Sequence, residues 1–267
     1  MMRALWTAGS GMMGQQLNVD VISNNLSNVN TTGYKKQRVE FKDLLYETLS
    51  QASVLDGMGK PVSLQVGHGV TPTATVSTYT MGNLERTDNP LDIAIDGDGF
   101  LTVRDVNGDL AYTRDGAFKI SINDGEAILV TSDGYPVLDE GDNEIFLTGI
   151  NINSLTINPD GSLTYIDEDE VVQPLGQSLK LVRFQNREGL IRDGSNFLRE
   201  SSASGEPMLE ADLENRSRIM QNFLESSNVQ VVEEMIKLIV AQRAYEVNSK
   251  SVQTADDMLG MANNLRR

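Results

Sequence analysis

The sequence predicts a mixed fold, in which a predominantly all-β body is inserted between N-terminal and C-terminal α-helices that pair as a coiled coil in the assembled state. Three observations support it. Apolar residues recur every seven positions near the start of the chain and again near its end. The intervening sequence instead consists of short β-like runs that alternate with Asp-Gly and Asn-Gly pairs, which is typical of strands joined by tight turns.

Residues 1–45 are expected to form the N-terminal helix. Four apolar residues fall seven apart: Leu5, Met12, Val19 and Leu26. Three positions after each stand Ala8, Gln15, Ile22 and Val29. Such a heptad seam holds one stripe of a helix against a partner helix. The early glycines each cost an isolated helix about 1 kcal/mol relative to alanine, and we expect them to permit close helix packing.

Asparagines are concentrated at the end of this segment. Gly33 and the following lysines fit a helix C-terminus, because glycine adopts the left-handed conformation and cations complement the helix dipole. Capping explains Asn24, Asn25 and Asn28 less well, because these residues lie within the helical period. We expect their carboxamides to form lateral hydrogen bonds with neighbouring subunits.

The rest of the chain is expected to contain four further parts. These are an extended connecting arm at 46–80, a β-rich body at 81–205, a return connector at 206–219 and a C-terminal helix at 220–267. The last helix has its own heptad series: Val231, Leu238, Tyr245, Val252 and Leu259. Met235 is expected to fill an intermediate position of that seam, and the two helices are expected to pair.

Composition excludes several functional classes. The chain has 267 residues, with 38 acidic against 22 basic side chains and a formal net charge of −16. An acidic protein is a poor ligand for nucleic acid or an anionic membrane, since both require a basic surface. No run reaches the roughly 18 apolar residues of a membrane span, and the N-terminus lacks the pattern of a Sec signal peptide. We therefore expect no nucleic-acid partner and no membrane insertion.

The sequence also lacks several residue types that catalytic and metal sites commonly use. Cysteine is absent, which excludes thiolate zinc sites and thiol nucleophiles. His68 is the sole histidine, so one chain cannot supply two histidine ligands to a metal. Most aspartates in the β-like region precede glycine, where they are expected to initiate turns. No catalytic, cofactor or metal site is expected, and no cofactor is required.

Two long terminal motifs and two internal ones resemble those of the bacterial flagellar rod and hook family. The terminal motifs are NNLSNVNTTGYKKQRVEFKDLLYETL (24–49) and SSNVQVVEEMIKLIVAQRAYEVNSKSVQTADDML (226–259). The internal ones are GNLERTDNPLDIAIDGDGF (82–100) and AYTRDGAFKI (111–120). The length, and an arm between Tyr46 and Leu64, are most similar to the distal rod branch of that family.

The resemblance implies a structural subunit of the flagellar basal body that polymerises helically into a rigid, hollow, torque-transmitting shaft around the export channel. It implies contacts with copies of itself, with neighbouring rod and hook proteins and with the type III export apparatus, and bushing rings are a further candidate. The terminal helices would form the inner layer. The expected assembly interface comprises Leu5, Met12, Val19, Ile22, Asn24, Asn25, Leu26, Asn28, Val29, Val231, Met235, Leu238, Tyr245, Val252 and Leu259.

Three alternatives remain open from the sequence. The first is a paralogous rod or hook-type subunit. The second is a secreted, β-rich glycan-binding or adhesin module with helical ends. The third is an enzyme that cleaves peptidoglycan, which would require a carboxylate whose replacement abolishes activity.

Overall fold

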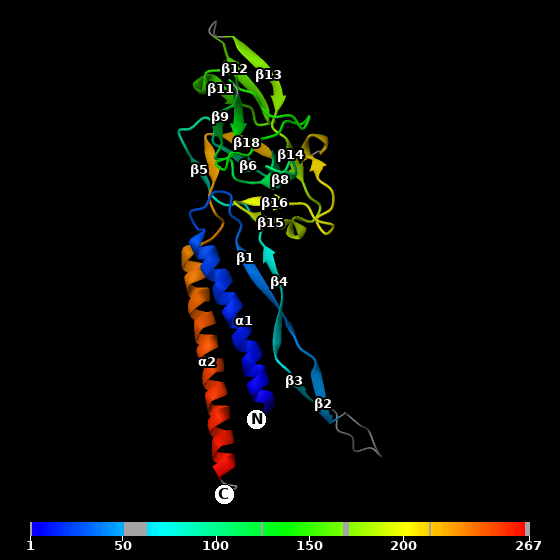
Figure 1. The fold of residues 1–267 in the computed structure, drawn as a ribbon, viewed down its shortest axis with the longest axis vertical. Helices are drawn as coiled ribbons and strands as arrows, with labels where there is room; N and C mark the ends of the chain where they lie inside the picture. Colours follow the sequence, from blue (N-terminus) through cyan, green and yellow to red (C-terminus); the bar gives the residue numbers. More distant parts are fainter. Residues whose placement is uncertain (1, 51–62, 124, 168–170, 214, 265–267) are drawn as a thin grey trace. The chain divides into compact units, whose positions relative to one another are not determined.

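The computed structural model describes residues 2–50, 63–123, 125–167, 171–213 and 215–264 (Figure 1). An N-terminal helix, a β-rich central part and a C-terminal helix are present, as the sequence predicts. The chain divides into two compact units. The helical unit comprises Met1–Ser27, Gln37–Ser77 and Gln230–Arg267. The β unit comprises Asn28–Lys36 and Thr78–Val229.

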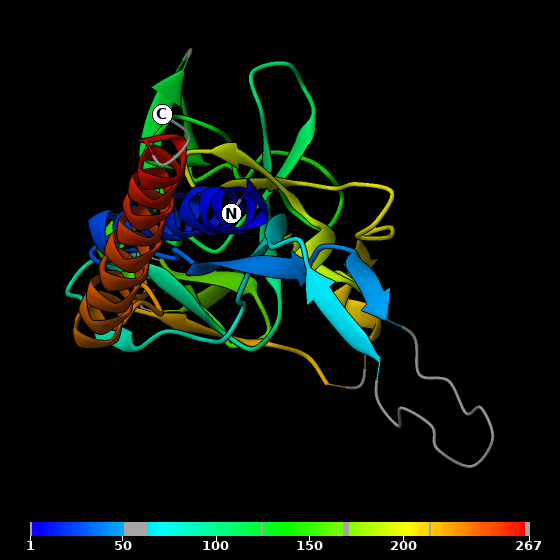
Figure 2. The same ribbon diagram turned by 90° about the horizontal axis from the view of Figure 1, so that it is seen from below.

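The helical unit contains α1 (Met2–Ser27) and α2 (Val231–Asn264). The two helices lie beside each other in Figures 1 and 2, where α1 is blue and α2 runs from orange to red. Gly11 and Gly14 permit close packing of α1. A Cβ on Gly11 would lie 3.0 Å from Asn248 Nδ2, and one on Gly14 would lie 3.1 Å from the Phe41 ring. Gly9 has no such neighbour within 4 Å, so of Gly9, Gly11 and Gly14 only Gly11 lies close to the partner helix, whereas Gly14 lies against the β-ribbon.

Helix α1 ends at Ser27, well before the expected boundary at residue 45. Ser, Asn and Thr side chains in 27–32 favour local hydrogen bonds that compete with the helix. The Thr31 side chain, for example, donates to Asn28 Oδ1 over 3.2 Å. Gly33 then takes a positive φ of 66°, and the chain continues as a strand from Gln37.

A two-stranded ribbon completes the helical unit. Strand β1 (Gln37–Asp43) pairs with β4 (Val70–Ser77), and β2 (Tyr46–Ser50) pairs with β3 (Leu64–Gly67), both antiparallel. Most ribbon side chains are exposed. Residues 51–62, which form the middle of the expected arm, lie outside the described part of the chain.

The β unit is built from short antiparallel strands. A six-stranded sheet has the order β15-β16-β8-β7-β14-β17, a three-stranded sheet has the order β11-β12-β13, and the remaining strands pair as β9 with β10, β6 with β18 and β5 with β19. The bounds are β5 Leu84–Arg86, β6 Ile93–Asp96, β7 Phe100–Arg104, β8 Leu110–Thr113, β9 Lys119–Asn123, β10 Glu126–Val130, β11 Leu155–Ile157, β12 Ser162–Ile166, β13 Val172–Ser178, β14 Leu181–Arg183, β15 Ile191–Gly194, β16 Phe197–Arg199, β17 Met208–Leu209, β18 Arg218–Gln221 and β19 Phe223–Glu225. Three-residue 3-10 helices lie at η1 Ile152–Ser154, η2 Arg187–Gly189 and η3 Glu210–Asp212.

Two apolar clusters form the core of the β unit. The larger contains mostly aliphatic side chains, including Ile93, Leu101 and Val137. The smaller is largely aromatic, with Phe100 and Tyr112 each in edge-to-face contact with Phe184. Burial of this apolar surface is the main driving force for folding the unit.

The C-terminal helix begins at Val231, whereas the sequence analysis placed its start at residue 220. The intervening residues form β18 and β19, which pair with β6 and β5. Ile219 lies in β18, is 2% exposed and belongs to the aliphatic core. Pairing of β18 with β6 places the side chain of Ile219 in this core. Glu233 and Glu234 then lie in the first turn of α2, where carboxylates complement the helix dipole.

Candidate assembly interface

The heptad seams bring α1 and α2 together within one chain. On α1, Ala8 and Ile22 are buried, and Leu5, Met12, Val19 and Leu26 are half-buried. On α2, Ala241 and Ala255 are buried, and Leu238, Val252 and Leu259 are half-buried. These residues therefore pack inside the subunit, as the spacing predicts.

Three predicted residues of α2 are more exposed than a seam requires. Val231 is 40% exposed, Tyr245 is 41% exposed and Met235 is 51% exposed. The sequence predicts that Met235 fills the seam position between Val231 and Leu238. In the structure Glu234, three residues after Val231, occupies that position. Glu234 is 2% exposed, and Lys237 Nζ lies 2.6 Å from its carboxylate.

The three predicted asparagines have different environments. Asn25 is 1% exposed and hydrogen-bonds within its own chain, so it is not available for the lateral contacts that the sequence analysis expected. Its carboxamide donates to Gln37 O over 2.8 Å and to Glu234 Oε2 over 3.2 Å. Asn24 is exposed on α1. Asn28 and Val29 are half-buried and belong to the β unit rather than to the helix.

Sequence analysis missed an exposed apolar face on α2. Seven residues, each at least 45% exposed, form it: Val232, Ile236, Ile239, Val240, Val247, Met258 and Met261. Because successive helical residues advance about 100°, all of them except Met258, which flanks the seam, lie on the side of α2 away from Ala241 and Ala255. The spacing from Val232 to Val240 is visible in the sequence, but these residues fall outside the heptad stripe.

Other large apolar side chains of the helical unit are also exposed. On α1, Trp6 and Met13 are each 74% exposed. On the ribbon, Leu45 is 86% exposed, and Tyr46 and Leu64 are each 58% exposed. Extended exposed apolar surface of this kind marks sites of protein–protein interaction.

In the β unit, several motif segments converge on the carboxylate of Glu225. Glu225 Oε1 accepts from Lys35 Nζ over 2.5 Å and from the Gly82 N–H over 2.9 Å. Glu225 Oε2 accepts from Arg114 Nε over 3.0 Å. The three charged side chains are each at most 3% exposed. A buried carboxylate is tolerated here because cations and a backbone amide surround it.

Asn228 extends this network. Its Nδ2 donates to Thr78 O over 2.8 Å, and its Oδ1 accepts from the Lys36 N–H over 2.7 Å. Gly33 N–H also donates to Glu225 O over 2.8 Å. The network thus connects the stretches through which the chain enters and leaves the β unit.

Electrostatics in this network shift one pKa strongly. Burial, and then the positive charge of Arg114, lower the pKa of Lys35 from 10.5 to about 8 although Glu225 opposes the shift. Elsewhere, hydrogen bonds from Arg199 to Asp193, Asp109 and Asp105 raise the pKa of Arg199 above its usual range.

Two aspartates of Asp-Gly pairs accept hydrogen bonds from the backbone two residues later, as expected for residues that initiate turns. Asp160 accepts from the Ser162 N–H over 3.3 Å, and Asp115 accepts from the Ala117 N–H over 3.1 Å. Within the described residues, no cluster of three or more histidine or acidic side chains is placed to hold a metal ion. Neither described helix is long and apolar enough to cross a membrane.

Family models match three parts of the chain. Residues 5–35 match "Flagella basal body rod protein", residues 94–165 match "Flagellar hook protein FlgE/F/G D1 domain", and residues 220–265 match "Flagellar basal body rod FlgEFG protein C-terminal". The matched ranges include both helices and the N-terminal part of the β unit.

Relatives match over the full length. Flagellar basal-body rod protein FlgG of Borreliella burgdorferi is 48% identical, over 100% of both chains. FlgG of Caulobacter vibrioides is 43% identical, over 99% of this chain and 100% of the relative. The flagellar hook-basal body complex protein FlhP of Bacillus subtilis is 34% identical, over 100% of both chains. These relatives are structural flagellar proteins.

Proposed function

Because this chain belongs to the flagellar basal-body rod protein FlgG family, the distal rod family, it is a structural subunit of the rod in the flagellar basal body, and we propose that its helical unit joins neighbouring copies into a hollow helical shaft. The exposed apolar face of α2 carries this proposal. One helix partner within the chain covers only the opposite face, so Val232, Ile236 and Ile239 would remain in water in a single subunit. Packing against helices of neighbouring copies buries them and continues the coiled-coil layer.

The ribbon supplies a second contact between copies. Its exposed side chains include Leu45 and Tyr46, which gain stability when neighbouring subunits cover them. Seven-residue and eight-residue strands also make the base of the ribbon stiffer than a free loop. We infer that the arm braces adjacent subunits and keeps the shaft straight under torque.

The proposed roles follow from this arrangement. The terminal helices line the export channel, and the β units form the outer layer. Neighbouring rod and hook proteins bind at the ends of the shaft, the type III export apparatus delivers the subunits, and bushing rings surround the finished shaft. The chain acts as a building block and performs no catalysis.

A single position on α2 tests the proposal. Ile239 is 56% exposed, so Ile239→Asp leaves the fold of a single subunit intact but places a charge in the contact between copies. We expect unchanged far-ultraviolet circular dichroism and loss of this protein from isolated basal bodies. Ile239→Leu is the matched control and should assemble as the wild type does. Normal rods built from Ile239→Asp would refute the interface.

A further inference from the structure

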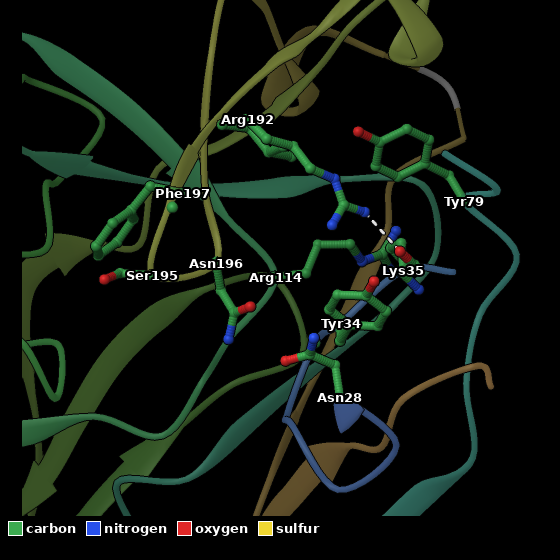
Figure 3. A pocket seen from close by; sticks show the side chains of 12 residues that line it. Asn28, Tyr34, Lys35, Tyr79, Arg114, Arg192, Ser195, Asn196 and Phe197 are labelled. Carbon is green, nitrogen blue, oxygen red and sulfur yellow. Dashed lines mark hydrogen bonds between the residues drawn. The ribbon is translucent and has the colours of Figure 1, made fainter. Parts of the chain in front are cut away.

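A small cavity of about 180 Å³ lies within the β unit. Its walls come from the 28–35 loop, Tyr79, Arg114 and the turn between β15 and β16. In Figure 3, Arg192 approaches from one side, while the carboxamides of Asn28 and Asn196 lie on the other. Since a water molecule occupies about 30 Å³ of the liquid, the cavity has room for one small polar group and a few waters.

The lining of this cavity is positively charged, although the protein is strongly acidic. Lys35, Arg114 and Arg192 all contribute to the wall, and none of the described lining residues is acidic. Glu225 pairs with Lys35 and Arg114 from outside the lining. The formal net charge of the whole chain is −16, so this concentration of cations is not a consequence of average composition.

The cations are held in place before any ligand arrives. Arg192 Nη2 donates to Lys35 O over 2.5 Å, and its guanidinium carbon lies 5.1 Å from the centroid of the Tyr34 ring. Arg114 is 3% exposed, and its buried Nη1 has no hydrogen-bond partner among the described residues. A fixed guanidinium loses little entropy on binding a carboxylate.

One wall has an uncommon backbone conformation. Gly194, Ser195 and Asn196 have φ angles of 93°, 46° and 63°, so three consecutive residues are left-handed. Two of them are not glycine, and the left-handed conformation is unfavourable for such residues. Asn196 Nδ2 donates to Thr32 O over 3.1 Å, which holds this wall beside the 28–35 loop. Strain of this kind is often retained where a site must keep its shape.

We propose that the cavity binds a carboxylate side chain presented by a neighbouring copy of this chain. The charge of the lining selects an anion, and the volume limits the ligand to a small group. With 38 acidic residues in each copy, any neighbour offers carboxylates. The neighbouring copy as the source depends on the proposed function, whereas the affinity of the cavity for a carboxylate does not.

The first experiment measures that affinity on the purified full chain. Acetate is titrated at constant ionic strength, with neutral acetamide as the matched probe, while the arginine side-chain N–H signals are followed by NMR. We expect saturable shifts of the Arg192 and Arg114 signals with acetate only. Arg192→Gln should weaken acetate binding about tenfold or more, because a charge-assisted hydrogen bond is lost. The absence of a saturable shift in the wild type overturns the proposal.

The second experiment supplies the carboxylate from within the chain. Asn28→Asp keeps the side-chain shape and places a negative charge in the lining, so it should abolish acetate binding and reduce incorporation into basal bodies. Asn30→Asp adds the same charge two residues away, at an exposed position outside the lining, and should do neither. Arg192→Gln should also reduce incorporation.

The outcomes separate the two levels of inference. If acetate binds but Asn28→Asp and Arg192→Gln assemble normally, the cavity takes a free small carboxylate, and the neighbouring copy is excluded as the source. If the Ile239→Asp variant also assembles normally, the proposed helix interface fails independently of the cavity. Loss of rods in Ile239→Asp together with normal rods in both cavity variants refutes only the assembly role of the cavity.

Discussion

The carboxamide of Asn25 forms two hydrogen bonds with the backbone of Gln37. Asn25 Nδ2 donates to Gln37 O over 2.8 Å, and the Gln37 N–H donates to Asn25 Oδ1 over 2.9 Å. The last turn of α1 is thereby attached to the first residue of β1. Asn25 also donates to the buried carboxylate of Glu234, so one side chain connects α1, the ribbon and α2.

Replacement of Asn25 should loosen this connection. Asn25→Ala removes partners from two backbone groups and from Glu234, each worth about 1–3 kcal/mol when left unsatisfied. We expect hydrogen exchange of the Gln37 amide to accelerate at least about tenfold, measured by NMR or mass spectrometry. Asn24→Ala, at an exposed neighbouring position, is the control and should change this rate little. Equal exchange rates in the two variants would contradict the role of Asn25.

Leu238 and Ile239 are adjacent in sequence but lie on different faces of α2. Leu238 is half-buried in the seam, whereas Ile239 is 56% exposed. Leu238→Asp should therefore separate the helices already within one subunit and lower the helical circular dichroism signal, while leaving the β unit folded. Ile239→Asp should leave that signal unchanged. The same loss of helical signal in both variants would argue against distinct faces.

The sequence predicted the helix pair because both seams repeat a simple spacing that is kept in the structure, as the buried Ile22 and the half-buried Leu238 show. It did not predict the role of Asn25, since only the folded chain brings Gln37 and Glu234 beside that carboxamide. The Glu225 network could not be predicted for the same reason, because its hydrogen-bonded partners are up to 192 residues apart in sequence. The predicted start of α2 at residue 220 is wrong because Met220 and Phe223 lie in β18 and β19, which pair with the distant strands β6 and β5.

Gly33 should tolerate no side chain. Its φ is 66°, and a Cβ would lie 2.8 Å from both the Arg114 carbonyl carbon and the Asp115 nitrogen. Gly33→Ala therefore combines backbone strain with a steric clash against main chain that cannot move freely. Gly108→Ala is the control, because Gly108 also has a positive φ, of 86°, but no neighbour within 4 Å.

We expect Gly108→Ala to lower the free energy of unfolding by about 1 kcal/mol, and Gly33→Ala to lower it by clearly more. Urea unfolding of both variants measures the difference. Equal losses would mean that the chain relaxes around the new methyl group.

Lys35 should titrate far below an ordinary lysine. Its pKa in the folded protein is about 8 against 10.5 for an exposed lysine. Between these values the unfolded chain binds more protons than the folded chain at this site, so the Lys35 contribution makes the free energy of unfolding rise with pH. NMR of the Lys35 ¹³Cε signal should give a midpoint near pH 8.

Arg187 provides a partner variant for this titration, because its charge also lowers the pKa of Lys35. Arg187→Gln should move the midpoint upward by a small amount. A midpoint near 10.5 in the wild type would show that the pairing with Glu225 outweighs burial and the repulsion from Arg114.

Removal of the charge on Glu225 tests the whole buried network. Glu225→Gln leaves Arg114 and protonated Lys35 in a buried site without a carboxylate, and breaking a buried ion pair in this way costs about 3–5 kcal/mol. Urea unfolding followed by near-ultraviolet circular dichroism reports on the buried Tyr112 and Tyr79 of the β unit. Glu206→Gln, at an exposed position, should alter stability by no more than about 0.5 kcal/mol.

The cost of Glu225→Gln should also depend on pH. At pH 7 Lys35 must either stay charged without its carboxylate or release a proton, whereas at pH 9 it is already largely neutral because its pKa is about 8. The loss of stability should therefore be smaller at pH 9 than at pH 7. The loss that persists at pH 9 is expected to come from Arg114, which also loses its carboxylate partner. A loss that is independent of pH would assign the destabilisation to Arg114 and the Gly82 amide alone.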